Sequence, residues 1–304
     1  MFIKSFNEED GIKIFIHKNE VSKKIESFYN VNPFPNYKKN EKPQDIIFKG
    51  DKNFILKQIA EKMKFDKKIL EVGSGTSQLS VYLALKTRSK IFALDTTKKS
   101  LQLGNKFTKN FKINNIDFIN ANIFDDIFEE DTFDLIWCSG VLHHTENPYN
   151  GFKRILKYLK PNGYIVIGLY NKIARTRTYM NKLLYKIFGK KTLIKIDPIL
   201  RNLSREPLEN KEKIEAWFRD QYLHPLESSH TYNELLDWFK LNNVNFINLY
   251  PKSIFDLNEN HNFFEKVDEL TYFQSYIDQL NLFIKHSAEG GLFTFIGKKN
   301  DYSR

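Results

Sequence analysis

The feature that most constrains the fold is a short apolar segment, a turn with two glycines and a helix-forming segment in direct succession, KKILEVGSGTSQLSVYLA at residues 67–84. Gly73 and Gly75 allow the backbone to turn tightly and to approach a ligand with no Cβ in the way. The helix after the turn offers free backbone N–H groups, which favour an anionic group. Because ligands of open α/β sheets bind at the carboxyl ends of the strands, beside turns of this kind, the segment predicts a binding site.

Strands and helices alternate from about residue 52 to Tyr170. Apolar segments typical of strands, KILEV, KIFALD, IDFINA, FDLIWCSG and YIVIGLY, are separated by segments of helical periodicity. This alternation predicts parallel βαβ units in an open α/β sheet. Residues 171–228 are basic and helical with no strand candidate. The alternation then resumes with a helix, the strand VNFINLY, a mostly helical stretch at 252–289 and a last strand, GGLFTFIGKK.

Composition favours a cytoplasmic globular protein. The hydrophobic share is 41%, which is ordinary for such proteins, and no apolar run approaches the roughly 20 residues that span a bilayer. The acidic start at Glu8–Asp10 does not resemble a signal peptide. A single cysteine, Cys138, excludes an internal disulfide and argues against a cysteine-built zinc site. The net charge of +10 is mostly lysine, and nucleic-acid binding is not favoured because arginine, the better phosphate ligand, is sparse.

The chemistry of the glycine turn narrows its ligand. A Walker phosphate loop is excluded, because Ser77-Gln78 stands where that loop needs lysine followed by serine or threonine. A dinucleotide turn is disfavoured, because Gln78 occupies the position of its third small residue. Glu71 would also lie beside a pyrophosphate of like charge. An acidic residue just before the turn suits a cationic ligand better.

Five segments, in order along the chain, resemble the motifs of class I S-adenosylmethionine-dependent methyltransferases. They are LEVGSGTSQLS, FALD, FINANIFDD, FDLIWCSGVLHHTENP and LKPNGYIVIGLYN, within about residues 65–171. The resemblance implies a Rossmann-like, doubly wound α/β fold whose seven-stranded sheet has its last strand antiparallel, with a helical cap insertion. It also implies S-adenosyl-L-methionine as the cofactor. The segments GLYN and DQYLHPLE are similar to those of a bacterial subgroup of these enzymes, and this similarity implies no particular acceptor.

The resemblance divides the chain into four segments. The expected segments are an N-terminal lid at 1–50, the cofactor-binding half of the α/β core at 51–171, the helical cap at 172–230, and the completion of the core with a short helical insertion at 231–304.

The resemblance also implies roles for residues near the turn. Glu71 would supply negative charge near the amino-acid end of the cofactor, Asp95 would accept hydrogen bonds from both ribose hydroxyls, and Asn122 would accept one from adenine. The expected cofactor-binding residues are Glu71, Gly73, Ser74, Gly75, Asp95, Thr96, Asn122, Ile123, Ser139 and Gly140. Two simpler interpretations stay open: Asp95 as a cap of the next helix and Asn122 as a turn residue.

Candidates for the acceptor pocket lie in two segments of the first half of the chain. The aromatic, proline-containing FYNVNPFPNY at 28–37 resembles a lid, with Tyr29, Phe34 and Tyr37 as candidates, and plain packing against the core is the alternative. In HHTENP at 143–148, His143 is expected at the substrate or lid side and His144 is a candidate base. A structural role in the cofactor shell is the alternative for both histidines.

A third candidate segment is DQYLHPLESSHT at 220–231, which is dense in titratable groups. Tyr222, His224 and Glu227 join His144 as candidate catalytic residues. A hydroxyl or carbon acid acceptor needs such a base, whereas a neutral amine or thiolate does not. No metal is expected, because Pro225 breaks the helical facing and the spacing is not a standard zinc pattern. A hydrogen-bonded hinge that returns the cap to the core is the alternative.

Residues 175–195, RTRTYMNKLLYKIFGKKTLIK, have the pattern of an amphipathic basic helix. Such a helix can lie on a membrane surface, but a cap over the active site is favoured. The leading interpretation is methyl transfer by in-line displacement to a small or medium-sized organic acceptor. The rivals are an RNA or protein methyltransferase, a protein that binds the cofactor without catalysis, and another group transfer from the same cofactor. The sequence indicates neither the acceptor atom nor the oligomeric state.

Overall fold

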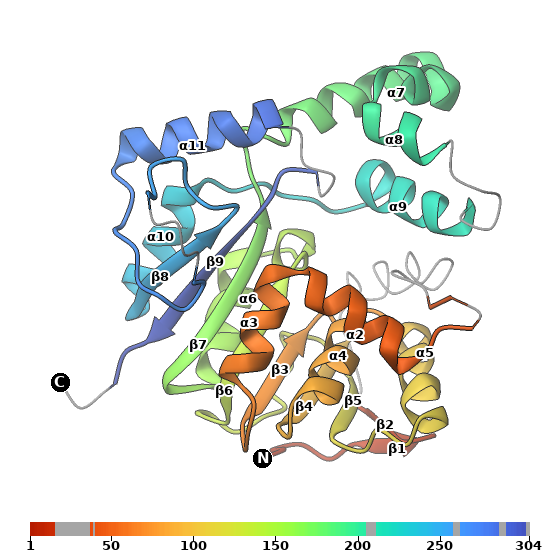
Figure 1. Cartoon of the computed structure of the whole chain (residues 1–304), viewed down its shortest axis with the longest axis vertical. Coiled ribbons are helices and arrows are strands. Elements are labelled where there is room, and N and C mark those ends of the chain that lie inside the picture. Colours follow the sequence, from red (N-terminus) through yellow and green to blue (C-terminus); the bar gives the residue numbers. More distant parts are fainter. Residues whose placement is uncertain (16–36, 39, 205–210, 258–261, 286–289, 302–304) are drawn as a thin grey trace.

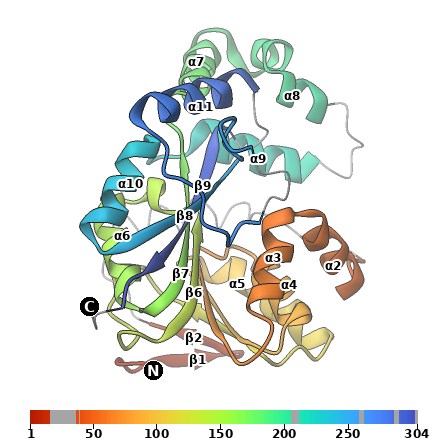
Figure 2. The same cartoon turned by 60° about the vertical axis from the view of Figure 1, so that its left-hand side comes forward.

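A computed structural model gives the arrangement of the chain (Figure 1). It describes residues 1–15, 37–38, 40–204, 211–257, 262–285 and 290–301. One large twisted sheet forms the body of the molecule, and helices α7, α8 and α9 lie together at the end far from the N-terminus in both views (Figures 1 and 2).

The sheet has nine strands within the described residues, in the order β1-β2-β5-β4-β3-β6-β7-β9-β8. Strand β9 is antiparallel to both of its neighbours, while β2, β5, β4, β3, β6 and β7 pair in parallel. The strands are β1 Asn7–Glu9, β2 Ile12–Ile14, β3 Lys68–Val72, β4 Lys90–Asp95, β5 Ile116–Asn120, β6 Phe133–Ser139, β7 Leu159–Tyr170, β8 Val244–Tyr250 and β9 Leu292–Lys299.

The expected count of seven strands is therefore too low. The two further strands, β1 and β2, come from the segment that the sequence analysis placed outside the core. Ile12 of β2 is buried and pairs with Phe118 of β5, whereas all three residues of β1 are exposed. β1 has no apolar residue, and the three residues of β2 are too few for their alternation to predict a strand, which is why the sequence did not reveal them.

Both faces of the sheet are covered, as the βαβ pattern predicts. Ile69 and Leu70, neighbours on β3, belong to two different apolar clusters because successive strand residues point to opposite faces. Helices α2 to α5 pack on one face and α6 and α10 on the other. The helices are α2 Pro43–Lys52, α3 Phe54–Lys62, α4 Gln78–Lys86, α5 Lys98–Asn110, η1 Leu142–His144 (a 3₁₀ turn), α6 Pro148–Lys157, α7 Thr176–Ile196, α8 Pro198–Leu203, α9 Lys211–Leu223, α10 Tyr232–Leu241 and α11 Tyr272–Lys285.

The stretch expected to be mostly helical at 252–289 contains one helix, α11, within its described residues. The chain before α11 instead runs along the outer strand β8. The Val267 amide donates to the Ile247 carbonyl, and the Asn248 side chain donates to the carbonyls of Asn262 and Glu265. This segment covers backbone groups that an edge strand would otherwise expose, so hydrogen bonding to the sheet decides its conformation.

Candidate active site

The glycine turn closes the carboxyl end of β3. The amides of Gly73 and Ser74 both donate to the Leu94 carbonyl, at 2.8 and 2.9 Å. Gly73 has a φ of +69°, and a Cβ on it would lie 2.2 Å from the Val141 side chain. Only glycine fits here, because the loop after β6 packs directly on the turn. The loops after β3 and β6 therefore meet at one edge of the sheet.

The Asp95 carboxylate ties this turn to the next strand. Its Oδ2 accepts from the Gly75 amide and its Oδ1 from the Thr97 amide, both at 2.7 Å. Asn120 donates to the carbonyls of Asp95 and Thr96, which fixes the backbone of the loop. Thr97 is the N-cap residue of α5, so Asp95 binds the amide of the residue that begins the helix and is not itself the cap. A carboxylate oxygen can accept more than one hydrogen bond.

Glu71 is a buried carboxyl at the end of β3. Its Oε2 accepts from the backbone amide of Ser80, at 2.9 Å, and from the Ser80 hydroxyl. Burial raises the pKa of Glu71 to about 8, although these hydrogen bonds oppose the shift and the nearby Asp95 charge adds to it. A cation bound beside Glu71 would relieve this cost of burying negative charge. The charge of the pocket therefore suits a cationic ligand.

Ser139 and Gly140 end β6 at the same edge. Gly140 has a φ of +78°, and a Cβ built on it would have no described atom within 4 Å, so open space lies over this residue. Ser139 instead packs on the neighbouring strand, because a Cβ on Gly168 would lie 2.0 Å from the Ser139 hydroxyl oxygen. Space for a ligand thus exists at Gly140.

Asn122 and Ile123 follow β5. The Asn122 side chain accepts from the backbone amide of Phe124 at 3.0 Å. The backbone amide of Asn122 donates to the Asp125 side chain. This is the turn role that the sequence left as an alternative. Ile123 is buried in the apolar cluster that includes Phe152. The side chains of both residues contribute to the local structure, so a ligand would be bound here mainly by backbone groups.

Tyr37 contacts the glycine turn. Its hydroxyl donates to the Thr76 carbonyl at 3.0 Å, and its ring stacks on Phe107 of α5. Burial raises its pKa well above the ordinary range, with the charges of Glu71 and Glu41 adding to the shift. Tyr29 and Phe34, the other two lid candidates, lie outside the described residues.

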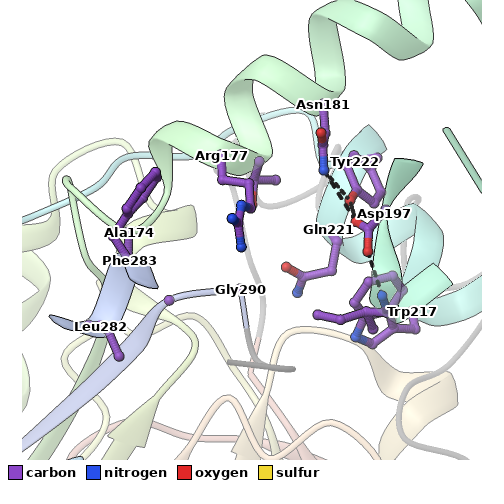
Figure 3. A pocket seen from close by; sticks show the side chains of 13 residues that line it. Ala174, Arg177, Asn181, Asp197, Trp217, Gln221, Tyr222, Leu282, Phe283 and Gly290 are labelled. Atoms are coloured by element: carbon purple, nitrogen blue, oxygen red, sulfur yellow. Dashed lines mark hydrogen bonds between the residues drawn. The ribbon is translucent and has the colours of Figure 1, made fainter. Parts of the chain in front are cut away.

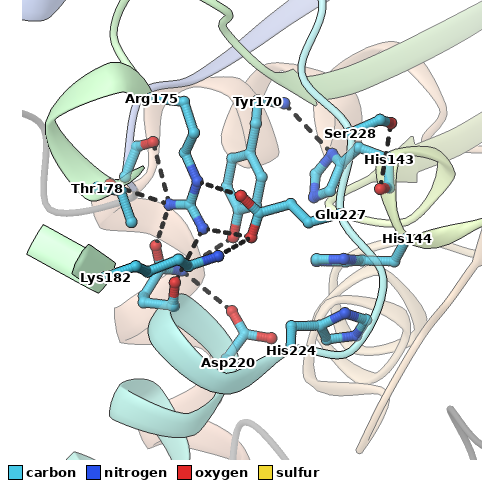
Figure 4. A network of polar contacts seen from close by, with 12 residues as sticks. His143, His144, Tyr170, Arg175, Thr178, Lys182, Asp220, His224, Glu227 and Ser228 are labelled. Atoms are coloured by element: carbon cyan, nitrogen blue, oxygen red, sulfur yellow. Dashed lines mark hydrogen bonds and ion pairs between the residues drawn. The ribbon is translucent and has the colours of Figure 1, made fainter. Parts of the chain in front are cut away.

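The rings of two histidines from distant segments of the chain, His144 and His224, lie in contact (Figure 4). The ring centroids of His144 and His224 are 3.6 Å apart. The Nδ1 atoms of His144 and His224 lie 2.8 and 2.6 Å from one carbonyl oxygen, that of Leu226. A carbonyl can only accept, so in neutral His144 Nδ1 carries the proton and Nε2 keeps its lone pair. The Nδ1 atom of His224 also accepts from the Leu226 amide at 3.2 Å, so its contacts do not fix one tautomer. Burial lowers the pKa of His144, and it lowers that of His224 to about 3.

His143 has the opposite tautomer. The Tyr170 amide donates to its Nδ1 at 3.3 Å, so Nε2 carries the proton. The side chain is fully buried and stacks on the Tyr170 ring, 3.9 Å between centroids. Its Nε2 has no hydrogen-bond partner among the described residues. A buried donor without a partner is uncommon and is consistent with a ligand or water at this point.

Glu227 lies at the centre of a charged network (Figure 4). The fully buried Arg175 donates to it through Nε at 2.8 Å and Nη2 at 2.7 Å, and Lys182 donates at 3.0 Å. Although its own burial acts in the opposite direction, the Arg175 and Lys182 charges and hydrogen bonds lower the pKa of Glu227 to about 2. The Arg175 guanidinium also lies 3.8 Å from the centre of the Tyr170 ring. A carboxylate held in this way is an anchor for the cap and a very weak base.

Arg175 was not among the site residues predicted from the sequence. Its position at the start of the cap helix is the one feature that sets it apart from the other basic residues of the cap. Its Nη1 donates to the Gln221 side chain at 2.6 Å and to the Gly290 carbonyl at 3.3 Å, and its Nη2 donates to the Gln221 carbonyl. One side chain therefore joins α7, α9, the segment after α9 and the start of β9.

Tyr222 lies on another side of the cap (Figure 3). Its hydroxyl donates to Asp197, which also accepts from Asn181 and from two amides at the start of α8. The cavity beside it holds about 20 Å³, room for one water. The structure thus brings together His144, His224 and Glu227, and it does not bring Tyr222 among them. No group of three metal-ligating side chains occurs within the ranges that the structure describes.

Comparisons with known proteins identify the family. A family model described as a methyltransferase domain matches residues 64–226, more than half of the chain. A protein of Synechococcus sp. described as uncharacterized is 26% identical over 198 residues, 59% of this chain and 48% of that protein. A ubiquinone biosynthesis O-methyltransferase of Photobacterium profundum is 26% identical over 135 residues, 44% of this chain and 54% of that protein. The chain thus spans about half the length of these curated relatives.

A solved structure shares the fold. PKMT2 from Rickettsia typhi, in complex with AdoHcy, superposes with a TM-score of 0.57 at 17% identity, over 77% of this chain and 49% of that one. The chain therefore belongs to the methyltransferase domain family, and the predicted class, an S-adenosylmethionine-dependent methyltransferase, is confirmed at the level of the family.

Proposed function

We propose that this chain transfers a methyl group from S-adenosylmethionine to a hydroxyl of a small or medium-sized organic acceptor. The family supports methyl transfer, and an O-methyltransferase of ubiquinone biosynthesis among the relatives supports a hydroxyl acceptor. Neutral His144 donates through Nδ1 to the Leu226 carbonyl, and its Nε2 would supply the base that a hydroxyl needs and that an amine does not.

The residues at the carboxyl ends of β3, β4 and β6 fit the cofactor. Asp95 provides negative charge, Glu71 would become charged when a cation binds beside it, and the described residues leave room over Gly140. The cofactor supplies an electrophilic methyl group on an already activated leaving group. Asp95 would accept from the ribose hydroxyls while Gly75 and Thr97 hold its carboxylate in place, and Glu71 would offset the positive charge. Thr96, Ser74, Ser139, Asn122 and Ile123 would line the same site.

His144 would act as the base. Its Nδ1 proton is donated to the Leu226 carbonyl, which leaves Nε2 to accept the proton of the acceptor hydroxyl as the oxygen attacks the methyl group. The Nδ1 atom of His224 lies 2.6 Å from the same carbonyl oxygen and its ring contacts that of His144, so it would hold the imidazole in place. His143 would contribute its unpartnered Nε2–H to the acceptor. Glu227, bound by Arg175, would position the cap that carries His224.

The single observation that carries this proposal is the pairing of His144 and His224 on one carbonyl, beside the loop that packs on the glycine turn. The test is a reaction with S-adenosylmethionine and a panel of phenols, catechols, quinols and aliphatic alcohols, read by mass spectrometry. A product heavier by one methylene group, formed by wild type and not by Asp95→Ala, supports the proposal. Methylation of RNA or protein only, or of amines only, would overturn it, as would binding of the cofactor without any transfer.

A further inference from the structure

The outer surface of α7 carries a row of apolar side chains. Met180, Leu183 and Ile187, spaced by three and four residues, have exposed fractions of 64%, 59% and 62%, and Phe188 beside them has 59%. This spacing places them on one face of the helix. Isolated exposed apolar residues are ordinary, but a contiguous row of this kind marks an interaction site.

Other side chains of α7 hold the helix in the cap. Asn181 is buried and donates to Asp197, and Leu193, which follows a kink at Gly189, is buried in the cap's apolar cluster. Lys182 and Lys190 form ion pairs with Glu227 and Glu215. Since these side chains already hold the helix, the outward apolar row is not needed to keep the cap in place.

The charged side chains of α7 itself are all basic. Helix α7 contains no acidic residue, and Lys186, Lys191 and Lys195 are exposed, with no ion-pair partner among the described residues. A second copy of this chain docked on the same face would bring like charges together. An anionic lipid surface offers both an apolar phase for the row and negative charge for the lysines.

The position of α7 permits such contact. Helices α7 and α11 lie at the same end of the molecule, far from the N-terminal strands, in both views (Figures 1 and 2). Helix α11 also has outward apolar residues, with Phe273 70% and Ile284 73% exposed. No helix among the described residues is both long enough and apolar enough to cross a membrane.

We propose that the outer face of α7 binds an anionic lipid surface. Met180, Leu183, Ile187 and Phe188 enter the headgroup region, and Lys186, Lys191 and Lys195 contact lipid phosphates. This surface lies outside the candidate active site, so the proposal goes beyond the proposed function and does not depend on it.

Vesicle flotation with the full chain tests this surface. Vesicles of phosphatidylcholine with phosphatidylglycerol are compared with vesicles of phosphatidylcholine alone, for wild type and for the double variant Leu183→Ser, Ile187→Ser. The matched control, Leu241→Ser with Leu257→Ser, removes two apolar side chains that are 73% and 89% exposed outside α7. None of these substitutions changes the net charge, so electrostatic attraction by the whole protein is the same in all three.

The expected result is binding of wild type to the anionic vesicles, weakened about tenfold or more by the α7 variant and unchanged in the control. Lys186→Gln with Lys191→Gln should weaken binding as well and lower its salt dependence. If the Leu183→Ser, Ile187→Ser variant fails to fold, the lysine variant tests the α7 surface in its place. Absence of wild-type binding, or equal binding by wild type and the α7 variant, would overturn the proposal. Light scattering that shows wild-type dimers and α7-variant monomers would overturn it in favour of a second copy.

Discussion

The rings of His144 and His224 lie 3.6 Å apart and both Nδ1 atoms contact the Leu226 carbonyl, although 80 residues separate the two histidines in the sequence. The Leu226 carbonyl fixes the tautomer of His144, which presents an unprotonated Nε2. Because His144 comes from the core and His224 from the segment that returns from the cap, the pair forms only when the cap is folded onto the core.

Replacing His144 by asparagine should lower kcat about 100-fold or more, because the base is lost, and leave the affinity for S-adenosylhomocysteine within about twofold. Kinetics and calorimetric titration on the same preparation measure the two quantities. Tyr222→Phe is the matched control, because Tyr222 donates to Asp197 on another side of the cap, and its kcat should stay near that of wild type. A larger loss in Tyr222→Phe than in His144→Asn would place the base elsewhere.

The pH dependence of kcat should follow the lowered pKa of His144. Burial and the charge of Arg175 lower it, while Asp220, Glu227 and the Leu226 carbonyl act in the opposite direction. A base works in its neutral form, so a lowered pKa moves the loss of activity to lower pH. An ordinary histidine loses roughly three quarters of its neutral form between pH 7.5 and 6. We expect kcat to fall by less than half over this range at saturating substrates, and half-loss at pH 6.5 or above would contradict this account.

Glu71 should make stability depend on pH. Its pKa is about 8 in the folded chain against 4.5 for the free group, so the folded state holds a proton that the unfolded state has released between these values. This contribution to stability is complete below pH 4.5 and is lost as pH rises through 8. Glu71→Gln removes the effect. Between pH 5 and pH 8 the free energy of unfolding of wild type should therefore fall by about 2–4 kcal/mol more than that of Glu71→Gln.

Urea unfolding at the two pH values measures this gain. Glu61→Gln, on the exposed side of α3, is the control and should follow wild type. A constant difference between Glu71→Gln and wild type across the range would mean that Glu71 is charged in the folded protein.

The buried ion pair of the cap should matter far more than an exposed one. Glu227→Gln leaves the fully buried Arg175 without its counter-charge and should destabilise the protein by about 3–5 kcal/mol. Glu215→Gln breaks the Lys190 pair, whose side chains are 39% and 47% exposed, and should cost less than about 1 kcal/mol. Thermal unfolding compares the two variants. Equal losses would show that Arg175 is satisfied by Gln221 and Gly290 alone.

The sequence predicted the core well because its strands are apolar runs and its turns carry glycine. The turn at Gly73 and Gly75 could be recognised from the sequence itself, whereas the antiparallel last strand and the role of Asp95 came from the resemblance to a family with a fixed order of motifs. The Arg175–Glu227 pair was missed, because 52 residues separate the partners and no periodicity joins them. The density of titratable groups at 220–231 indicated a site, but only the fold separates Tyr222, which contacts Asp197, from His224, which contacts His144.

The most direct test of the account is calorimetric titration of S-adenosylmethionine and S-adenosylhomocysteine into wild type, Asp95→Ala and Asp117→Ala. Asp117 is the matched control, because it lies on the neighbouring strand β5 and pairs with Lys13 and Lys90 away from the glycine turn. We predict micromolar binding by wild type and by Asp117→Ala, and a loss of about tenfold or more in Asp95→Ala. Equal affinity of all three, or no binding by folded wild type, would contradict the assignment of the glycine turn and Asp95 to the cofactor.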